Sequence, residues 1–235
     1  MKIIFKLNDT LQVISKASTT NAKIESDNKR KIVQTYTFSR KQFELIAESK
    51  NEGMKMFFSN ADTNCLDCPF NSFGSCYTHK FNQYVGFISM LKSIAKIYPK
   101  WDDIPVFKNH MTIKATEMAK GTYVRFGTYG EPSLHPVQLI KSMVESAENY
   151  TGYTHQWDKN DLGAFFMAST HDLRAEAVAR AKGYRSFIVT DEKIGGIVNC
   201  PASEEAGKKS TCSKCNLCSG TNGTKSNKSI FILTH

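Results

Sequence analysis

The chain of 235 residues is 40% hydrophobic and 23% charged, which suits a compact folded protein and excludes intrinsic disorder. Its two longest apolar-rich stretches, 81–98 and 134–144, are interrupted by polar and charged residues, which excludes a membrane span and a membrane partner. The first residues reach Lys6 and Asp9 without the small-residue cleavage site of an export signal, so we expect a cytoplasmic protein.

The charge balance is basic: 31 Lys and Arg face 22 Asp and Glu, a net charge of +9. A positive surface attracts polyanions, so nucleic acid is a candidate partner, and a merely solvated basic surface is the alternative. A reducing compartment disfavours disulfides. We therefore expect the seven cysteines to be either metal ligands or buried thiols.

Residues 1–52 are expected to form a short N-terminal α+β section. Two β-like runs, 3–7 and 32–38, lie on either side of a polar stretch. A helix is predicted over 39–49, with Ser39 as its cap, because apolar residues follow Ser39 at helical spacing.

Residues 53–198 alternate short apolar runs with helical patterns, which is typical of β/α units and a mainly parallel sheet. A helix is predicted over 81–98. Strands are predicted at 54–59, 122–126, 150–154, 164–168 and 186–190. A helix after the fourth strand should bury an apolar face made of Leu173, Ala177, Val178 and Ala181. Because polar residues follow several strands, we expect a full or partial (β/α) barrel.

Residues 199–235 are rich in Cys, Lys, Ser, Gly and Asn and lack large apolar residues before a final strand at 230–233. Such a segment cannot build its own core, so we expect a bound metal to order residues 199–220. The predicted fold is therefore α/β: an N-terminal α+β section, a (β/α) barrel domain and a cysteine-rich metal-binding appendage.

The C-terminal cysteines follow the pattern C-x11-C-x2-C-x2-C. Two-residue spacers let thiolates converge on one centre, and a more distant thiolate closes the shell of a zinc ion or an iron–sulfur cluster. The tight run favours a 4Fe-4S cluster, with zinc as the alternative. The predicted ligands are Cys200, Cys212, Cys215 and Cys218.

Three further cysteines, Cys65, Cys68 and Cys76, lie in a polar loop. With His79 as the fourth ligand they would form a closed Cys3His zinc site. Without it, three thiolates would hold a four-iron cluster with one iron open to a substrate or cofactor. Ordinary buried thiols are a third interpretation, which a loop rich in Asn, Asp and Ser disfavours.

The order of the motifs resembles that of the radical S-adenosylmethionine enzymes: a cysteine loop comes first, then a helix, and then a strand followed by Gly130-Glu131-Pro132. In that superfamily a three-cysteine loop holds a 4Fe-4S cluster, and a Gly-Gly-Glu-Pro stretch contacts the amino group of S-adenosylmethionine. The resemblance implies a partial barrel, an open cluster on the loop, cofactor contacts from Gly130 and Glu131, and an auxiliary C-terminal cluster. The cysteine spacing here is C-x2-C-x7-C where the family has C-x3-C-x2-C, and Tyr129 replaces the first Gly.

The span 54–218 also resembles small bacteriophage proteins that share a Cys-Tyr loop, a Gly-Glu loop and a cysteine-rich tail. A third resemblance, to tRNA-guanine transglycosylases and their phage DNA-modifying relatives, rests on a barrel joined to a cysteine-bound zinc. Those enzymes use an aspartate nucleophile and base pair. Here Glu131, Asp158 and Asp172 lie near predicted strand ends, but none of them sits in a motif of that group. The sequence has no Walker, dinucleotide-binding or Gly-x-Ser-x-Gly motif, which disfavours nucleotide triphosphatases, dehydrogenases and hydrolases.

Polar residues near the strand ends are the site candidates. Arg125 and His155 join Gly130 and Glu131 as predicted cofactor contacts, and no catalytic residue is assigned. Further candidates are His135, Trp157, Ser169, His171 and Asp172. We expect an iron–sulfur enzyme of the radical S-adenosylmethionine type that modifies nucleic acid or another macromolecule during phage infection. The alternative is a zinc-stabilised nucleic-acid-binding protein or a transglycosylase-like base-modifying enzyme.

Overall fold

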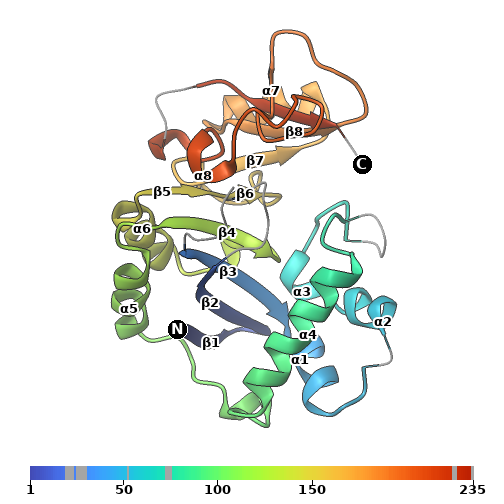
Figure 1. Ribbon diagram of the computed structural model, residues 1–235, viewed down its shortest axis with the longest axis vertical. Coiled ribbons are helices and arrows are strands. Elements are labelled where there is room, and N and C mark those ends of the chain that lie inside the picture. The colour runs from blue at the N-terminus through green and yellow to red at the C-terminus, as the bar shows by residue number, and fades with distance from the viewer. Residues whose placement is uncertain (19–23, 25–30, 52, 72–75, 224–226, 234–235) are drawn as a thin grey trace.

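The computed structural model describes residues 1–18, 24, 31–51, 53–71, 76–223 and 227–233. Two five-stranded sheets with helices on their faces make up the fold, which confirms the predicted α/β class (Figure 1). The described strands form two separate sheets, so the predicted barrel is not confirmed. None of the described helices is long and apolar enough to cross a lipid bilayer.

The first sheet begins with three antiparallel strands and continues with two that run parallel to the third. In sheet order its strands are β1 (Lys2–Leu7), β2 (Thr10–Ser18), β3 (Lys31–Ser39), β4 (Tyr123–Tyr129) and β5 (Asn149–Thr151). β3 belongs to the N-terminal section, and its neighbour β4 belongs to the β/α region. The two parts of the chain therefore share one sheet.

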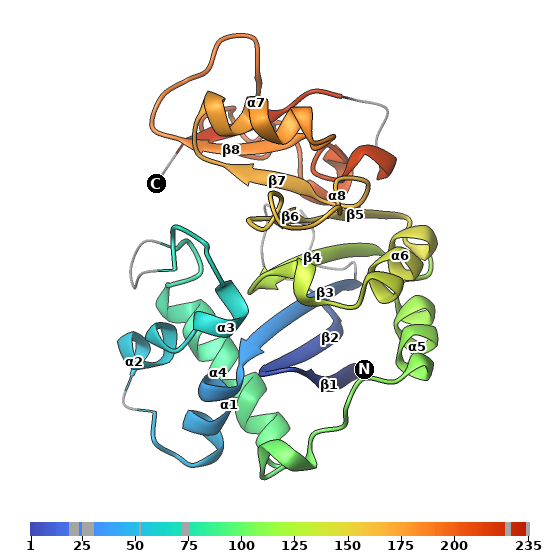
Figure 2. The ribbon, with the colours of Figure 1, turned by 180° about the vertical axis from the view of Figure 1, so that it is seen from behind.

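Helices cover both faces of the first sheet (Figures 1 and 2). On one face lie α1 (Arg40–Ala47), α2 (Met54–Ser59), α3 (Asp62–Cys65) and α4 (Phe81–Ala95), and on the other lie α5 (Asn109–Ala119) and α6 (Val137–Ser146). Phe58 and Phe87 share an aromatic core with Phe38 of β3. Leu139 of α6 packs in a second core with Val124 of β4. Short 3-10 helices lie at η1 (Trp101–Asp103), η2 (Pro132–Leu134) and η3 (Thr221–Gly223).

Neighbouring strands of the second sheet all run parallel. In sheet order they are β6 (Tyr153–Thr154), β7 (Met167–Thr170), β8 (Ser186–Thr190), β10 (Ile230–Leu233) and β9 (Val198–Asn199). Ala179 of α7 (Leu173–Ala181) packs with Ala168 of β7. Met167 directly precedes Ala168 on β7, so its side chain points to the other face of the sheet. On that face it packs with Cys200 and Cys218. The cysteine-rich segment, with α8 (Cys212–Cys215), thus completes a core of the second sheet.

Gly152 separates β5 from β6, where the sequence predicts one strand over 150–154. A Cβ at Gly152 would lie 2.6 Å from the ring of Phe166, so only glycine fits at this position. The Gly152 N–H donates to the carbonyl of Cys218, and its own carbonyl accepts from the Met167 N–H, both at 3.1 Å. The two sheets therefore meet at a residue that also binds the cysteine-rich segment.

Most of the predicted elements are confirmed. Strands are present at 3–7, 32–38, 186–190 and 230–233, and helices at 39–49 and 81–98, with bounds close to those predicted. Ser39 caps α1 as predicted: its Oγ accepts the Gln42 N–H at 3.0 Å, and Gln42 Oε1 accepts the Ser39 N–H at 3.1 Å. This capping box satisfies two backbone donors at once and explains where the helix begins.

Residues 54–59 form helix α2, so the strand predicted there is wrong. A short apolar run does not by itself distinguish a strand from a buried helix. The adjacent Phe57 and Phe58 lie in the same aromatic core, whereas neighbours on a strand would point to opposite faces. The strand predicted at 164–168 is displaced and begins at Met167.

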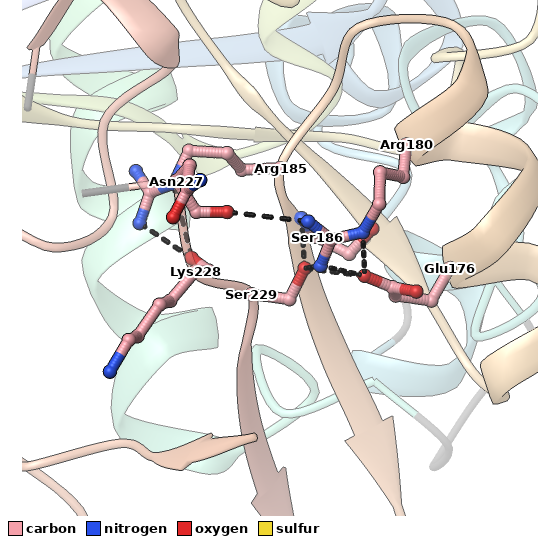
Figure 3. A network of polar contacts seen from close by, with 7 residues as sticks. All are labelled: Glu176, Arg180, Arg185, Ser186, Asn227, Lys228 and Ser229. Atoms are coloured by element: carbon pink, nitrogen blue, oxygen red, sulfur yellow. Dashed lines mark hydrogen bonds and ion pairs between the residues drawn. The ribbon is translucent and has the colours of Figure 1, made fainter. Parts of the chain in front are cut away.

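Helix α7 forms as predicted, but its apolar face is turned outward. The residues predicted to be buried are all exposed: Leu173, Ala177, Val178 and Ala181. The buried side of α7 carries Glu176, whose Oε1 accepts from Ser229 Oγ at 2.7 Å and from Arg180 Nη2 at 2.5 Å (Figure 3). Ser229 in turn accepts the Ser186 N–H at 3.2 Å. The buried face of α7 therefore combines Ala179 with Glu176, whose carboxylate is satisfied by Ser229, directly before β10, and by Arg180.

Candidate metal centres at the strand ends

The first cysteine group lies where strands β3 and β4 end. Asn64, which precedes Cys65 in α3, donates from Nδ2 to the carbonyl of Thr37 in β3 at 2.9 Å. The Asn64 carbonyl accepts the Glu131 N–H at 2.7 Å, just beyond the end of β4. These two hydrogen bonds hold the cysteine loop at the carboxyl ends of two parallel strands, where binding sites of α/β proteins commonly form.

The thiols of this group are close enough to affect one another's ionisation. Burial raises the pKa of the Cys65 thiol well above its ordinary value, and the neighbouring thiols of Cys68 and Cys76 raise it further. Burial likewise raises the pKa of Cys68 to about 12. Cys76 Sγ lies 3.1 Å from Thr78 Oγ1. Without a metal, the thiols of Cys65 and Cys68 are thus kept neutral, and a bound cation is the partner that would stabilise their ionised form.

Glu131 connects the end of β4 to the end of β6. Its side chain is only 3% exposed. Oε1 accepts the Ser133 N–H at 3.1 Å, and Oε2 accepts the His155 N–H at 3.0 Å. Burial raises the pKa of this carboxyl group, although the hydrogen bonds oppose the shift. The carboxylate therefore positions the backbone of His155 in addition to capping the short helix η2.

Gly130 allows the close approach of these strand ends. Its φ is +74°, and a Cβ would lie 2.4 Å from the carbonyl oxygen of Thr37. No side chain fits at that distance from a backbone oxygen. The prediction that Gly130 and Glu131 contact a cofactor remains a prediction, while both residues have a defined structural role.

His155 brings a side-chain nitrogen to the first cysteine group. Its Nε2 lies 3.6 Å from Cys68 Sγ, and its Nδ1 lies 4.0 Å from Glu131 Oε2. The His155 ring stacks on that of His171, with centroids 5.9 Å apart. Burial and the neighbouring His171 lower the pKa of His155 to about 4, so the imidazole is neutral and has a free lone pair.

His79, the predicted fourth ligand of a zinc site, lies in a different environment. Its ring packs on Phe58 with centroids 4.1 Å apart, beside the aromatic core. The backbone N–H of His79 donates to the carbonyl of Cys76 at 2.9 Å, so both histidines lie near the cysteine loop.

The second cysteine group gathers on the second sheet. Cys200, Cys212 and Cys218 all contact one apolar cluster. Burial raises the pKa of the Cys218 thiol well above its ordinary value, and Cys200, Cys212 and Cys215 raise it further. Cys218 therefore lies near the other three cysteines of this group, up to 18 positions away in the sequence, while the four-thiolate ligand set stays a prediction.

Arg185 holds the backbone on both sides of Cys218 in place. Its guanidinium donates to the carbonyls of Leu217 and Ser219 at 2.8 Å each. It also donates to the carbonyl of Lys228 at 2.9 Å (Figure 3). The residue is 2% exposed, and burial lowers its pKa. Its charge is compensated by backbone carbonyls rather than by a carboxylate, so Arg185 acts as a positioning residue for the second cysteine group.

Replacing Arg185 with Lys is expected to lower the free energy of unfolding by about 2 kcal/mol, because an ammonium group cannot reach all these carbonyls and buried acceptors lose their donors. Urea-induced unfolding followed by circular dichroism measures the change. Arg174→Lys, at an exposed position of α7, is the matched control and should leave the midpoint unchanged. Equal midpoints for both variants would contradict the positioning role.

Arg125 lies between the two cysteine groups. On β4, its Nη2 donates to the hydroxyl of Tyr77, next to Cys76, at 3.2 Å. Burial alone would lower the pKa of Arg125, but the Tyr77 phenol and the Cys212 thiol raise it above its ordinary value. The guanidinium therefore interacts with one residue beside the first group and with one member of the second.

The other predicted site residues have mainly structural contacts. Trp157 Nε1 donates to the carbonyl of Ser169 at 3.2 Å. Asp172 caps α7, accepting the Ala175 N–H at 2.7 Å. The His171 ring meets Phe70 edge-on, with centroids 4.8 Å apart. These residues surround the first group without forming a recognisable catalytic set.

His135 is buried, 2% exposed, and neither of its ring nitrogens has a hydrogen-bond partner among the residues that the structure describes. Burial lowers its pKa to about 4. The unfolded chain takes up this proton below about pH 6.5, whereas the folded protein does not until about pH 4, so acidification favours unfolding.

Because of His135, we expect the free energy of unfolding to fall by about 3 kcal/mol as the pH drops from 6.5 to 4. In the His135→Leu variant this part of the fall should be absent. Urea unfolding at several pH values for wild type and variant measures the difference between the two curves. Replacement of the exposed His110 by Leu is the control and should leave the pH profile of the wild type unchanged. Parallel profiles for wild type and His135→Leu would refute the expectation.

Two residues with clear roles at the centres are missed by sequence reasoning. Arg185 directly precedes β8, and a lone arginine at the start of an apolar strand is its only sequence signal. Asn64 precedes the first cysteine, where a polar loop residue attracts no attention. Both act through carbonyls that are remote in the sequence.

Within the described residues, no three His, Cys, Asp or Glu side chains already converge closely enough to hold a metal ion. The donor chemistry nevertheless suits a thiophilic metal, because buried thiols and a neutral imidazole are its preferred ligands. Comparison of the chain with protein-family models, with curated proteins and with solved structures found no match.

Proposed function

We propose that this chain is a metalloprotein with two thiolate centres, one at the strand ends of the first sheet and one on the second sheet. The gathering of all seven cysteines into a group of three and a group of four carries this proposal, together with their occurrence as free thiols. Bound metal would supply cross-links between segments that are remote in the sequence and, in an iron–sulfur form, redox chemistry.

An iron–sulfur enzyme resembling the radical S-adenosylmethionine group is the first form of the proposal. It is supported by the parallel strands β3, β4, β5–β6, β7 and β8, which follow one another in sequence order across the two sheets, as in a partial barrel. Cysteines, Glu131 and His155 follow the ends of three of these strands. In this form Cys65, Cys68 and Cys76 hold the open cluster, and the C-terminal cysteines hold a closed one.

A zinc-stabilised protein is the second form, and one distance favours it at the first group. His155 Nε2 and Cys68 Sγ are 3.6 Å apart, which suits two ligands of a single ion. Ligands of a cubane cluster bind different irons and lie farther apart. With a net charge of +9, either form is proposed to act on nucleic acid.

The first experiment is elemental analysis of the full chain purified without oxygen, together with an absorbance spectrum. Iron and acid-labile sulfide in the amount of two clusters support the enzyme form and call for S-adenosylmethionine cleavage assays. Two zinc ions and a colourless protein support the zinc form. A protein free of both metals overturns the proposal. Nucleic-acid affinity that does not fall with rising salt would remove the proposed partner.

A further inference from the structure

The first centre has three thiols, and a closed tetrahedral site needs a fourth donor. Zn–S distances of about 2.3 Å and Zn–N distances of about 2.05 Å place two such ligands about 3.6 Å apart around a tetrahedral ion. The separation of His155 Nε2 and Cys68 Sγ has this value. The pair already has the spacing of two ligands that share one ion.

We infer that His155, rather than His79, is the fourth donor to a single metal ion held by Cys65, Cys68 and Cys76. This inference rests on the proposed function and deepens it, because it gives the first centre a Cys3His shell. The His79 ring packs on Phe58. His155 Nε2 already lies 3.6 Å from Cys68 Sγ, which is the observation that favours His155.

Glu131 is the positioning residue for this donor. Its Oε2 accepts the backbone N–H of His155 at 3.0 Å and lies 4.0 Å from the Nδ1 of the same residue. The 4.0 Å separation is longer than a hydrogen bond, so the carboxylate fixes the backbone of His155 and acts on a proton at Nδ1 only electrostatically. A proton at Nδ1 leaves the lone pair of Nε2 for a metal. Carboxylates near metal-bound histidines commonly act in this way.

The loop that carries Cys68 and the loop that carries His155 are joined at a second point. Asp67, the neighbour of Cys68, forms an ion pair with Lys159, four residues after His155. Both side chains are exposed, so the pair contributes little energy, but it shows that the two loops lie side by side. The closeness of Cys68 and His155 is therefore a property of the loops and not of one side-chain rotamer.

The test uses the full chain, stripped of metal under reducing conditions and reloaded with Co2+, whose visible spectrum reports its thiolate and imidazole ligands. Zinc affinity is measured in parallel by competition with a chromophoric chelator. The variants are His155→Ala, His155→Cys, His79→Gln, Glu131→Gln and Cys65→Ser, with exposed His110→Ala as the matched control.

We expect His155→Ala to weaken zinc binding at the first centre by about 100-fold or more and to change the cobalt spectrum. Glu131→Gln should weaken binding by about 10-fold, as removal of a carboxylate near a metal-bound histidine does. His155→Cys should restore binding with a stronger thiolate charge-transfer band, because a fourth thiolate replaces the imidazole. Such a rescue would show that the Ala variant loses zinc affinity because a ligand is missing and not because the protein unfolds. His79→Gln and His110→Ala should retain the wild-type spectrum.

Two results would overturn the inference in different ways. If Cys65→Ser removes an ion but His155→Ala retains it with unchanged spectrum and affinity, His155 is not a ligand and the proposed centre survives. If wild type and Cys65→Ser bind the same number of ions, no ion is held at the first centre. The proposed function then fails at this centre, and the inference fails with it.

Discussion

Replacement of Cys218 with Ser is expected to remove the metal of the second centre and to lower the free energy of unfolding by about 4 kcal/mol or more. Cys218 is the most connected member of its group: its thiol interacts with the other three, and its carbonyl accepts hydrogen bonds from Thr151 Oγ1 and Gly152 N at 3.1 Å each. A hydroxyl group is a poor ligand for a thiophilic metal. Because residues 200–220 also complete the core of the second sheet, loss of metal should expose apolar surface.

Elemental analysis and thermal unfolding of Cys218→Ser test this expectation. Cys65→Ser is the matched control: it should remove the metal of the first centre only and leave the second sheet intact. Both variants exchange one buried or half-buried thiol for a hydroxyl, so differences between them report which centre is lost. Full metal content in Cys218→Ser would show that the C-terminal cysteines are not a metal centre.

Gly130→Ala is expected to lower the free energy of unfolding by about 4 kcal/mol, because strain at positive φ and a clash with backbone act together. The added Cβ would lie 2.4 Å from the Thr37 carbonyl oxygen and 3.1 Å from that of Asn64. β3 and α3 would both have to move, and the hydrogen bond between Asn64 and Glu131 would be disturbed. Chemical denaturation monitored by circular dichroism measures the effect.

Gly121→Ala separates the two contributions. Gly121 also has a positive φ, +61°, but nothing lies within 4 Å of its Cβ position. This variant should lose only the conformational part, about 1 kcal/mol. If Gly130→Ala proves no more destabilising than Gly121→Ala, the close approach of β4 to β3 does not limit this position.

The roles of Gly130 and Glu131 affect how the resemblance to radical S-adenosylmethionine enzymes should be tested. The resemblance implies that both residues contact a cofactor. In the structure, Gly130 permits strand contact and Glu131 hydrogen-bonds to the backbone of His155. Variants at either position will therefore alter the first centre whether or not a cofactor binds, and cofactor affinity should be compared only among variants that retain metal and fold.

Much of the fold and of the candidate site follows from local sequence patterns. The cap at Ser39 and the short apolar runs of β8 and β10 are contained within a few residues, so the predicted bounds are close to those observed. Cysteine spacing belongs to the same class of local signal. Cys65 lies near Cys68 and Cys76, and Cys218 lies near Cys200, Cys212 and Cys215, while the two ligand sets themselves stay predictions.

The sequence by itself determined the α/β class and most of the strands and helices, and it predicts the division of the cysteines into two groups. Only the tertiary structure decided that 54–59 is a helix, that α7 turns its Glu176 side chain inward and that His155 lies beside Cys68. Cys68 and His155 are 87 positions apart, and Glu176 and Ser229 are 53 apart. Periodicity, capping and spacer length describe neighbours along the chain, whereas these contacts arise from the order in which parallel strands are laid side by side.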